Sequence, residues 1–321
     1  MHPVDRLAPV MFRIDRSRAT VFRHGWGDPV GIGLFDHPEV RSTPAPTIEI
    51  VWGRKEEHRG MRLRRGRFTS PLADHLPEAA RVVTVDLHEP ARGSDRLVIL
   101  MPAWNDHGPA ARSALSRLLA DRGIASLIIE APFLGTRRVR PTGEHPIGTV
   151  ADFARMGAGL VLETRALIAS LGARRRIGVS GYSMGGNLAA LVAAVSPLPV
   201  AVAPLAASYS PGPVFTGAVM SRAVSWQTLS DGGGPDRLRE VMDRSSVLAL
   251  PPPPNAGSAV FVAGRRDGFV PLELTERLTR HWGDPELVVT DDGHATLLWR
   301  RKPVLVDAIV SSFDRAGGRT P

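Results

Sequence analysis

One short stretch of the chain combines a serine with the small residues that an activated nucleophile requires. Residues 177–187 read IGVSGYSMGGN, in which a β-type run leads into Gly-Tyr-Ser-Met-Gly and an alanine-rich helical run follows. This is the G-x-S-x-G pattern in a strand, turn and helix context, where the turn pushes the Ser183 hydroxyl out of the sheet. Gly181 and Gly185 are needed because a Cβ at either position would collide with the neighbouring strand or helix. The alternative is a glycine turn with an incidental serine.

Two further residues complete a set that would activate this serine. A serine hydroxyl needs a base to take its proton and an acid to orient that base. Asp267 stands just beyond the apolar run 260–263, and His294 follows the last such run, 287–289. The chain order Ser, Asp, His is the one expected for a nucleophile on a turn of this type. We therefore predict a triad of Ser183, His294 as the base and Asp267 as the acid.

Other roles and other carboxylates compete with this assignment. Asp267 precedes a proline-started helix and would also serve as a helix-capping carboxylate. Asp291 and Asp292 lie in the same loop as His294, where they suit turn formation better. The sequence favours Asp267 as the acid and keeps these two aspartates as alternatives.

Backbone N–H groups near the serine are the expected donors to an oxyanion. The first is the N–H of Met184, directly after the nucleophile and at the positive end of the following helix. The second comes from the loop after the apolar run 97–101, which places Trp104 or Ala103 there. The sequence does not indicate which of these two residues donates its N–H.

Tyr182 in the turn and His107 in the loop after 97–101 are the candidate substrate contacts, although His107 would equally suit a helix cap. No histidine pair has the spacing of a metal site. The chain contains no cysteine, which excludes disulfides, cysteine-ligated zinc and thiol catalysis. We therefore expect a reaction that needs neither a metal nor another cofactor.

The elements that would position these residues alternate between strands and helices. Apolar runs predict strands in the middle of a sheet, and the periodic segments between them predict covering helices. This alternation is typical of an α/β fold with a mainly parallel central sheet and helices on both faces. The predicted strands are 48–52, 61–68, 81–87, 96–101, 124–129, 177–179, 200–203, 260–263 and 287–289, and the predicted helices are 110–121, 149–171, 187–196, 272–281 and 304–313.

The alternation is interrupted once. Residues 208–257 carry many prolines and glycines between short apolar pieces, so we predict a cap or lid inserted over the sheet, with a disordered loop as the alternative. Residues 1–80 are expected to form an N-terminal arm and first strands packed on the core. Residues 81–315 form the main domain in this division, and residues 316–321 a frayed tail.

The net charge of +8 comes almost entirely from arginine. The basic clusters lack a nucleic-acid motif or interleaved aromatic residues, so we expect solvated surface and no nucleic-acid partner, with contact to an anionic membrane surface as the alternative. No segment has the pattern of a secretory signal or a membrane span, and the expected location is cytoplasmic. The clusters are Arg62/Arg64/Arg65/Arg67, Arg137/Arg138/Arg140, Arg174–Arg176 and Arg300–Arg301.

Over about residues 80–315 these features together resemble the α/β-hydrolase superfamily. The chain resembles more closely the group around α/β-hydrolase domain-containing protein 18, and this likeness also takes in residues 66–77. The resemblance implies hydrolase activity on esters, lipid esters among them. That group typically carries Pro-Gly-Thr-Gly-Asp-His where this chain has MPAWNDH at 101–107, so Trp104 is bulky where the group is small. The resemblance rests on GRFTSP at 66–71, LP at 76–77, DH at 106–107, EAPFLG at 130–135, DF at 152–153, MG at 156–157, SMGG at 183–186 and the segment 208–217.

These observations lead to one main hypothesis and two alternatives. In the main one, Ser183 attacks the acyl carbon of a small-molecule or lipid-like carboxylic ester or thioester, and His294 transfers the proton. A peptidase or amidase on the same triad is the second, because the difference lies in pocket shape and in protonation of the leaving group. A non-catalytic ligand-binding or interaction protein on the same scaffold is the third. The oligomeric state is left open.

Overall fold

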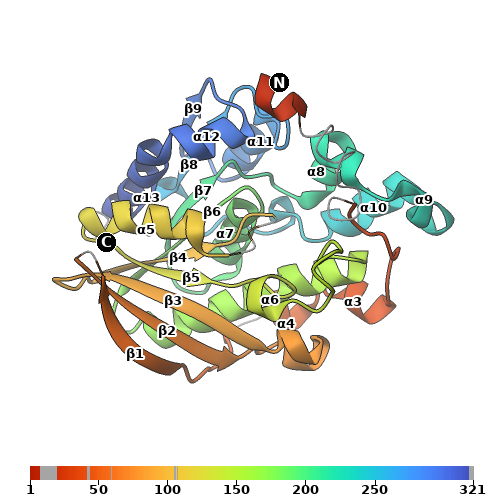
Figure 1. Cartoon of the computed structure of the whole chain (residues 1–321). Helices are drawn as coiled ribbons and strands as arrows, with labels where there is room; N and C mark the ends of the chain where they lie inside the picture. The colour runs from red at the N-terminus through yellow and green to blue at the C-terminus, as the bar shows by residue number, and fades with distance from the viewer. Residues whose placement is uncertain (8–19, 42–43, 59, 105, 107, 318–321) are drawn as a thin grey trace.

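The computed structural model describes residues 1–7, 20–41, 44–58, 60–104, 106 and 108–317. Within these residues, nine strands form one sheet in the order β1-β2-β3-β5-β4-β6-β7-β8-β9 (Figure 1). The strands from β5 to β9 in this order are parallel to one another. The strands are β1 (Val51–His58), β2 (Met61–Thr69), β3 (Val82–Pro90), β4 (Arg96–Met101), β5 (Ala125–Ile129), β6 (Arg176–Tyr182), β7 (Ala201–Leu205), β8 (Val260–Gly264) and β9 (Glu286–Thr290).

The first three strands add an antiparallel extension to this parallel core. β1 and β2 pair antiparallel across a turn at Gly60, whose φ of 76° is a left-handed conformation that glycine adopts readily. β2 pairs antiparallel with β3, and β3 with β5. The predicted parallel sheet is confirmed for the part that carries the serine, and the complete sheet is mixed.

Helices cover both faces of the sheet, as the sequence predicts. β4 shows the division: Leu97, Ile99 and Met101 pack in one core with α6 and α7, whereas Val98 and Leu100 pack in a second core with α5 and α13. This alternation follows from the period of two along a strand. The helices are α3 (Pro29–Gly33), α4 (Pro38–Arg41), α5 (Ala110–Asp121), α6 (Val150–Leu171), α7 (Met184–Val195), α8 (Pro211–Gly217), α9 (Trp226–Leu229), α10 (Gly234–Asp243), α11 (Leu272–His281), α12 (His294–Arg300) and α13 (Lys302–Gly317).

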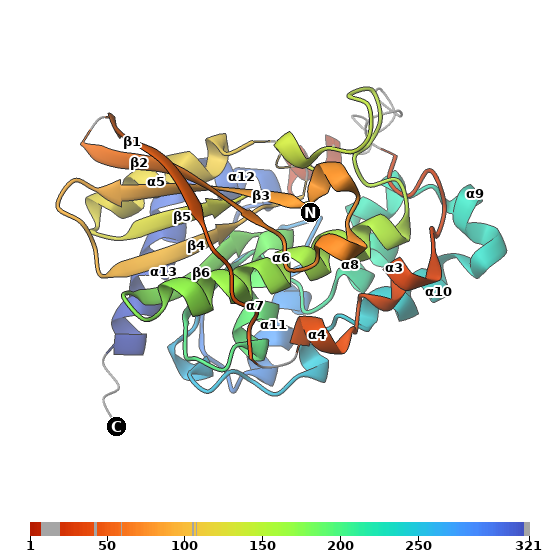
Figure 2. The ribbon, with the colours of Figure 1, turned by 90° about the horizontal axis from the view of Figure 1, so that it is seen from below.

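The longest of these helices, α6, starts at a well-formed cap. The Thr149 hydroxyl accepts the Asp152 N–H at 3.0 Å, and the Asp152 carboxylate accepts the Thr149 N–H at 3.0 Å. This reciprocal pair satisfies two N–H groups that the helix itself leaves without partners. Figure 2 shows α6 crossing the molecule, with β1 and β2 toward one end and α9 and α10 toward the other.

The N-terminal arm and the segment between β7 and β8 pack against each other. Val21 forms a parallel bridge with Val224, and the Trp26 indole N–H donates to the Leu229 carbonyl at 3.3 Å. The arm then reaches α6, where Asp28 pairs with Arg155 at 2.7 Å. The N-terminal arm, the segment between β7 and β8, and α6 are distant in sequence and thus pack together at one end of the molecule.

Ala316 and Gly317 are the last residues of α13, and the rest of the predicted tail, residues 318–321, lies outside the described residues. One expectation needs correction. The expectation of a solvated surface is wrong for Arg137, which is 1% exposed. Its guanidinium forms two hydrogen bonds with the buried Glu163 carboxylate, at 2.7 and 3.0 Å.

Candidate active site

The serine stands on a strained turn between β6 and α7. Ser183 has a φ of 58° and a ψ of −117°, a left-handed conformation that non-glycine residues rarely adopt. A Cβ at Gly181 would lie 2.6 Å from the Gly185 carbonyl carbon, and a Cβ at Gly185 would lie 2.6 Å from the Met101 oxygen. Both glycines are therefore required by close approach of the backbone, as the sequence predicts.

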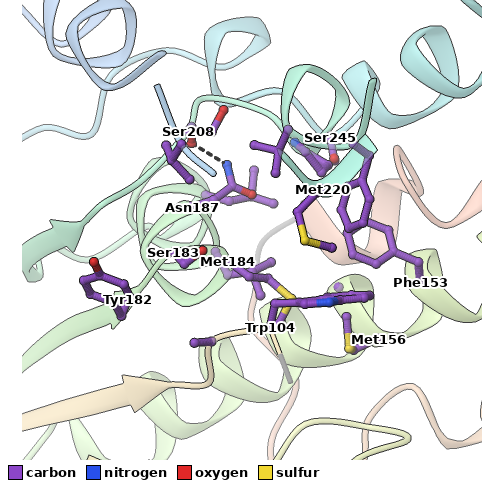
Figure 3. Close-up of a pocket in the computed structure, with 18 of the residues that line it drawn as sticks. Trp104, Phe153, Met156, Tyr182, Ser183, Met184, Asn187, Ser208, Met220 and Ser245 are labelled. Atoms are coloured by element: carbon purple, nitrogen blue, oxygen red, sulfur yellow. Dashed lines mark hydrogen bonds between the residues drawn. The ribbon is translucent and has the colours of Figure 1, made fainter. Parts of the chain in front are cut away.

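Neighbouring strands hold this turn in place. The Ser183 N–H donates to the Leu205 carbonyl of β7 at 2.8 Å. One turn into α7, the Asn187 side chain donates to the Ser208 carbonyl at 2.8 Å (Figure 3). The serine is thus attached to β7 and to the start of the segment that follows β7.

The predicted acid and base meet beyond the ends of β8 and β9. Asp267 Oδ2 lies 2.6 Å from His294 Nδ1, and the Asp267 side chain is 1% exposed. The other carboxylate oxygen, Oδ1, accepts the N–H groups of Phe269 and Val270, each at 2.8 Å. Asp267 therefore stabilises its own turn with one oxygen and orients the imidazole with the other.

The two alternative aspartates have other partners. Asp291 pairs with Arg265 at 3.2 Å on the surface, and Asp292 pairs with Arg301 at 2.8 Å. Both pairs connect the loop after β9 to neighbouring segments. The geometry therefore favours Asp267 over Asp291 and Asp292 as the partner of the imidazole.

The environment of His294 favours its charged form. Burial lowers the pKa of His294, but the charge of Asp267, its hydrogen bond to the ring and the charge of Asp5 outweigh burial, so the pKa is raised from 6.5. The ring stacks on Phe269 with centroids 5.0 Å apart and contacts Tyr182 at the same separation. These contacts keep the ring in one orientation.

The predicted oxyanion donors lie on the turn that carries the serine and on the loop after β4. The Met184 N–H is the first of α7, where the helix leaves N–H groups without partners and carries partial positive charge. Ala103 and Trp104 border the same cavity as Ser183. The loop after β4 is adjacent to the turn, because the Met101 and Pro102 carbonyls lie 2.6 and 2.9 Å from a Cβ built on Gly185.

An apolar cavity of about 380 Å³ opens in front of these groups. Ser183 and His294 both border it, and Asp267 lies behind His294. Figure 3 shows Trp104 in this cavity with Met220 and Met156 on opposite sides of its ring. Further apolar lining comes from Leu34, Phe35, Val40, Phe153, Val161, Met184, Leu188, Leu191, Val195, Val214, Phe215, Leu298 and Trp299.

The two predicted substrate contacts have different outcomes. Tyr182 borders the cavity, but its hydroxyl donates to the His294 carbonyl at 2.6 Å and so is already engaged. Burial, followed by the charge of Asp267, raises the pKa of Tyr182 well above 10.0, so the hydroxyl stays protonated. His107 lies outside the described residues.

Sequence reasoning missed two contributions from the N-terminal arm. Leu34, Phe35 and Val40 form part of the cavity wall, and their only signal is an apolar pair and a valine among polar residues and glycines. Asp5 hydrogen bonds to the loops that carry Asp267 and His294. Nothing in the sequence around Asp5 indicates that contact.

The described part of the chain holds no cluster of three or more His, Cys, Asp or Glu side chains arranged for a metal ion. The same part of the chain contains no helix with the length and hydropathy needed to cross a bilayer.

A mainly parallel sheet, a strained serine between β6 and α7, and an Asp–His pair beyond β8 and β9 define an α/β-hydrolase. The chain matches the family described as "Alpha/beta hydrolase domain containing 18" over residues 19–233 and 233–315. The protein belongs to this family of hydrolases.

Several solved structures share the fold at low sequence identity. A cold-adapted esterase from an Arctic intertidal metagenomic library is 18% identical, with a TM-score of 0.51 over 81% of this chain and 99% of that one. An S-formylglutathione hydrolase from Agrobacterium tumefaciens is 15% identical, with a TM-score of 0.52 over 84% and 100% of the two chains. Est1E from Butyrivibrio proteoclasticus is 15% identical, with a TM-score of 0.50 over the same shares. These similarities concern the fold.

Proposed function

We propose that the protein is a serine hydrolase that cleaves a carboxylic ester or thioester through an acyl-enzyme. The observation that carries this proposal is the 2.6 Å contact between His294 Nδ1 and Asp267 Oδ2, beside a cavity that Ser183 also borders. This contact leaves Nε2 of His294 as the ring nitrogen available to a serine hydroxyl. Two of the structural neighbours are named as an esterase and an S-formylglutathione hydrolase, and these names agree with this reaction class.

In the proposed reaction, Ser183 Oγ attacks the acyl carbon while His294 takes its proton. Asp267 stabilises the imidazolium that forms, and the Met184 N–H with that of Ala103 or Trp104 binds the oxyanion. The C–O or C–S bond then breaks, and His294 gives the proton to the departing alcohol or thiol. Water, deprotonated by the same imidazole, attacks the acyl-serine. The acyl carbon–Oγ bond then breaks, the imidazolium returns the proton to Ser183 Oγ, and the carboxylic acid leaves.

The cavity supports an apolar acyl group as the part of the substrate that is buried. Met184, Leu188, Leu191 and Val195 border it from one face of α7, over a helix length of about 16 Å. An aliphatic chain beside this face would gain about 0.8 kcal/mol for each buried methylene, or about fourfold in kcat/KM. The substrate class that we propose is therefore an ester with an aliphatic, lipid-like acyl chain.

The segment between β7 and β8 is the proposed lid. Pro211, Val214 and Phe215 of α8 border the cavity, as does Met220. These residues would close over the acyl chain and exclude water from the acyl-serine while the alcohol departs.

The test compares wild-type protein with Ser183→Ala. A fluorophosphonate should label Ser183 in the wild type, and the variant should lose labelling and lose ester turnover by a factor on the order of 10⁶. Esters from acetyl to palmitoyl then measure the preferred acyl length, and the thioester and anilide of the best acyl group separate the leaving-group classes. Ester hydrolysis that persists in folded Ser183→Ala would refute the proposal. Absence of labelling in folded wild type would also count against it.

A further inference from the structure

Residues 1–7 lie against the two loops that carry Asp267 and His294. In Figure 1 the first helical turn of the chain lies beside α12, the helix that begins at His294. The His2 N–H donates to the Arg266 carbonyl at 2.7 Å, directly before Asp267 in the chain. The first residues are therefore attached to the backbone next to the acid of the site.

Within this segment, Asp5 makes the contacts that connect the two loops. Its side chain accepts the Gly268 N–H at 2.9 Å and the His294 N–H at 2.9 Å, both with Oδ2. The other oxygen accepts the Ala295 N–H at 3.4 Å. Gly268 follows Asp267 directly, so a single oxygen connects the backbone at the acid to the backbone at the base.

The burial of Asp5 means that position 5 requires a side chain that accepts hydrogen bonds. Asp5 is 1% exposed. A carboxylate in such a place is costly unless charge-assisted hydrogen bonds compensate for the lost water. Here the compensation comes from backbone N–H groups, two of them at the positive end of α12. A side chain without an acceptor oxygen at position 5 would leave these N–H groups without an acceptor.

Two glycines beside the acid and the base make room for the segment. A Cβ on Gly293 would lie 2.3 Å from the His2 Cβ and 2.8 Å from Asp5 Oδ2. A Cβ on Gly268 would lie 2.7 Å from the Met1 side chain. Both loops thus leave space for residues 1–5 at the positions that adjoin Asp267 and His294.

We infer that Asp5 is a positioning residue of the catalytic site: by accepting the N–H groups of Gly268 and His294 with one oxygen, it fixes the loop of the acid relative to the loop of the base. This inference rests on the proposed function, because the role of His294 as the base gives the positioning its catalytic consequence. Asp5 acts through the backbone of His294 and does not border the substrate cavity.

The charge of Asp5 has a second effect on the same ring. The charged groups that raise the pKa of His294 are Asp267 and, after it, Asp5, while burial of the ring lowers it. Tyr182 also faces the ring and stays neutral. Removal of the negative charge at position 5 should therefore lower the pKa of His294, an effect that a purely structural contact would not produce.

The test uses Asp5→Asn, which keeps the shape and one acceptor oxygen but removes the charge. We expect kcat to fall by a factor on the order of 10 to 10², the scale of a small misplacement of catalytic groups, with KM unchanged. We also expect slower phosphonate labelling of Ser183, and a lower His294 pKa in an NMR titration of the imidazole. Asp5→Glu keeps the charge but displaces it, so it should lower kcat and retain more of the raised pKa of His294.

The matched control is Asp152→Asn, at another carboxylate that accepts backbone N–H groups at a helix start. It should destabilise the fold without changing the His294 titration. If Asp5→Asn leaves the pKa of His294 and kcat at their wild-type values, or lowers kcat no more than Asp152→Asn does, the inference is wrong. The NMR titration and amide exchange at Gly268 and His294 need no substrate, so they decide the role of Asp5 even if wild-type protein fails to cleave esters.

Discussion

The phenolic hydroxyl of Tyr182 donates a 2.6 Å hydrogen bond to the backbone carbonyl of His294. Tyr182 directly precedes Ser183, so the bond joins the nucleophile turn to the residue that carries the base. The two rings are also in contact, with centroids 5.0 Å apart. The two halves of the site are thus connected directly, across 112 residues of chain.

Tyr182→Phe removes that hydrogen bond and leaves the ring contact in place. The His294 carbonyl would lose this hydrogen bond, which should cost about 0.5–1.5 kcal/mol of unfolding free energy. We expect kcat to fall on the order of tenfold because His294 is held less firmly. Urea denaturation and ester kinetics measure the two effects. Tyr209→Phe is the control, since that hydroxyl accepts from Arg239 and Arg277. An equal loss of kcat in both variants would contradict the role of Tyr182.

The raised pKa of His294 predicts the pH dependence of activity. The base must be neutral to take the serine proton, so kcat/KM should fall as the pH drops through this pKa. Because the pKa is raised from 6.5, the acid limb of the profile should lie above that value. In Asp267→Asn the acid limb should move to lower pH, with a loss of about 10⁴-fold in kcat. An acid limb that stays in place in Asp267→Asn would show that another group titrates there.

Trp104 should limit the size of the acyl group. Its ring borders the cavity and packs edge-on against Phe215, with centroids 5.3 Å apart. Trp104→Leu should raise the ratio of kcat/KM for long or branched acyl esters over acetyl ester. Its indole N–H has no hydrogen-bond partner among the described residues, so the substitution removes no hydrogen bond with them.

The matched control for Trp104 is Trp282→Leu. Trp282 is buried, whereas Trp104 is partly buried. The indole N–H of Trp282 also lacks a partner in the described part of the chain, and its ring packs on Phe261 away from the cavity. This variant should lose stability and keep the wild-type acyl preference. If both substitutions shift the acyl preference equally, the assignment of Trp104 to the cavity wall is wrong.

Among substitutions in α6, those that break the buried pair of Arg137 and Glu163 should lower the free energy of unfolding most. Both side chains are at most 1% exposed, and the Ser70 hydroxyl also donates to Glu163 at 2.6 Å. Glu163→Gln would leave Arg137 as a buried charge without its counter-ion, at a cost of about 3–5 kcal/mol. The exposed pair of Arg122 and Asp307 gives the comparison, because Asp307→Asn should cost about 1 kcal/mol or less. Similar denaturation midpoints for the two variants would contradict the difference.

The parallel core and the nucleophile turn were predictable because their signals are local. Central strands are buried on both faces and therefore appear as unbroken apolar runs, as at residues 97–101 and 260–263. The strained turn at Ser183 requires small residues beside it, and Gly181 and Gly185 make this requirement visible in the sequence. The meeting of Asp267 and His294 then follows from the ends of two neighbouring parallel strands.

The remaining features depend on partners far away in the chain. Arg137 stands among other arginines, a pattern typical of surface, and its burial is set by Glu163 on α6. Leu34 and Phe35 show no periodicity that would identify them as cavity wall. Asp5 is an isolated acidic residue in the sequence, and its partners are backbone N–H groups 263 to 290 residues away.

The hydrogen bond from the His294 N–H to Asp5 closes a loop of 289 residues, and this has a consequence for folding order. Contacts that close long loops form late in folding, because the chain loses conformational entropy before the contact stabilises it. Strand pairing and the turn at Ser183 depend on shorter separations and should form first. During refolding, recovery of ester hydrolysis should therefore lag behind recovery of the circular dichroism signal of the sheet.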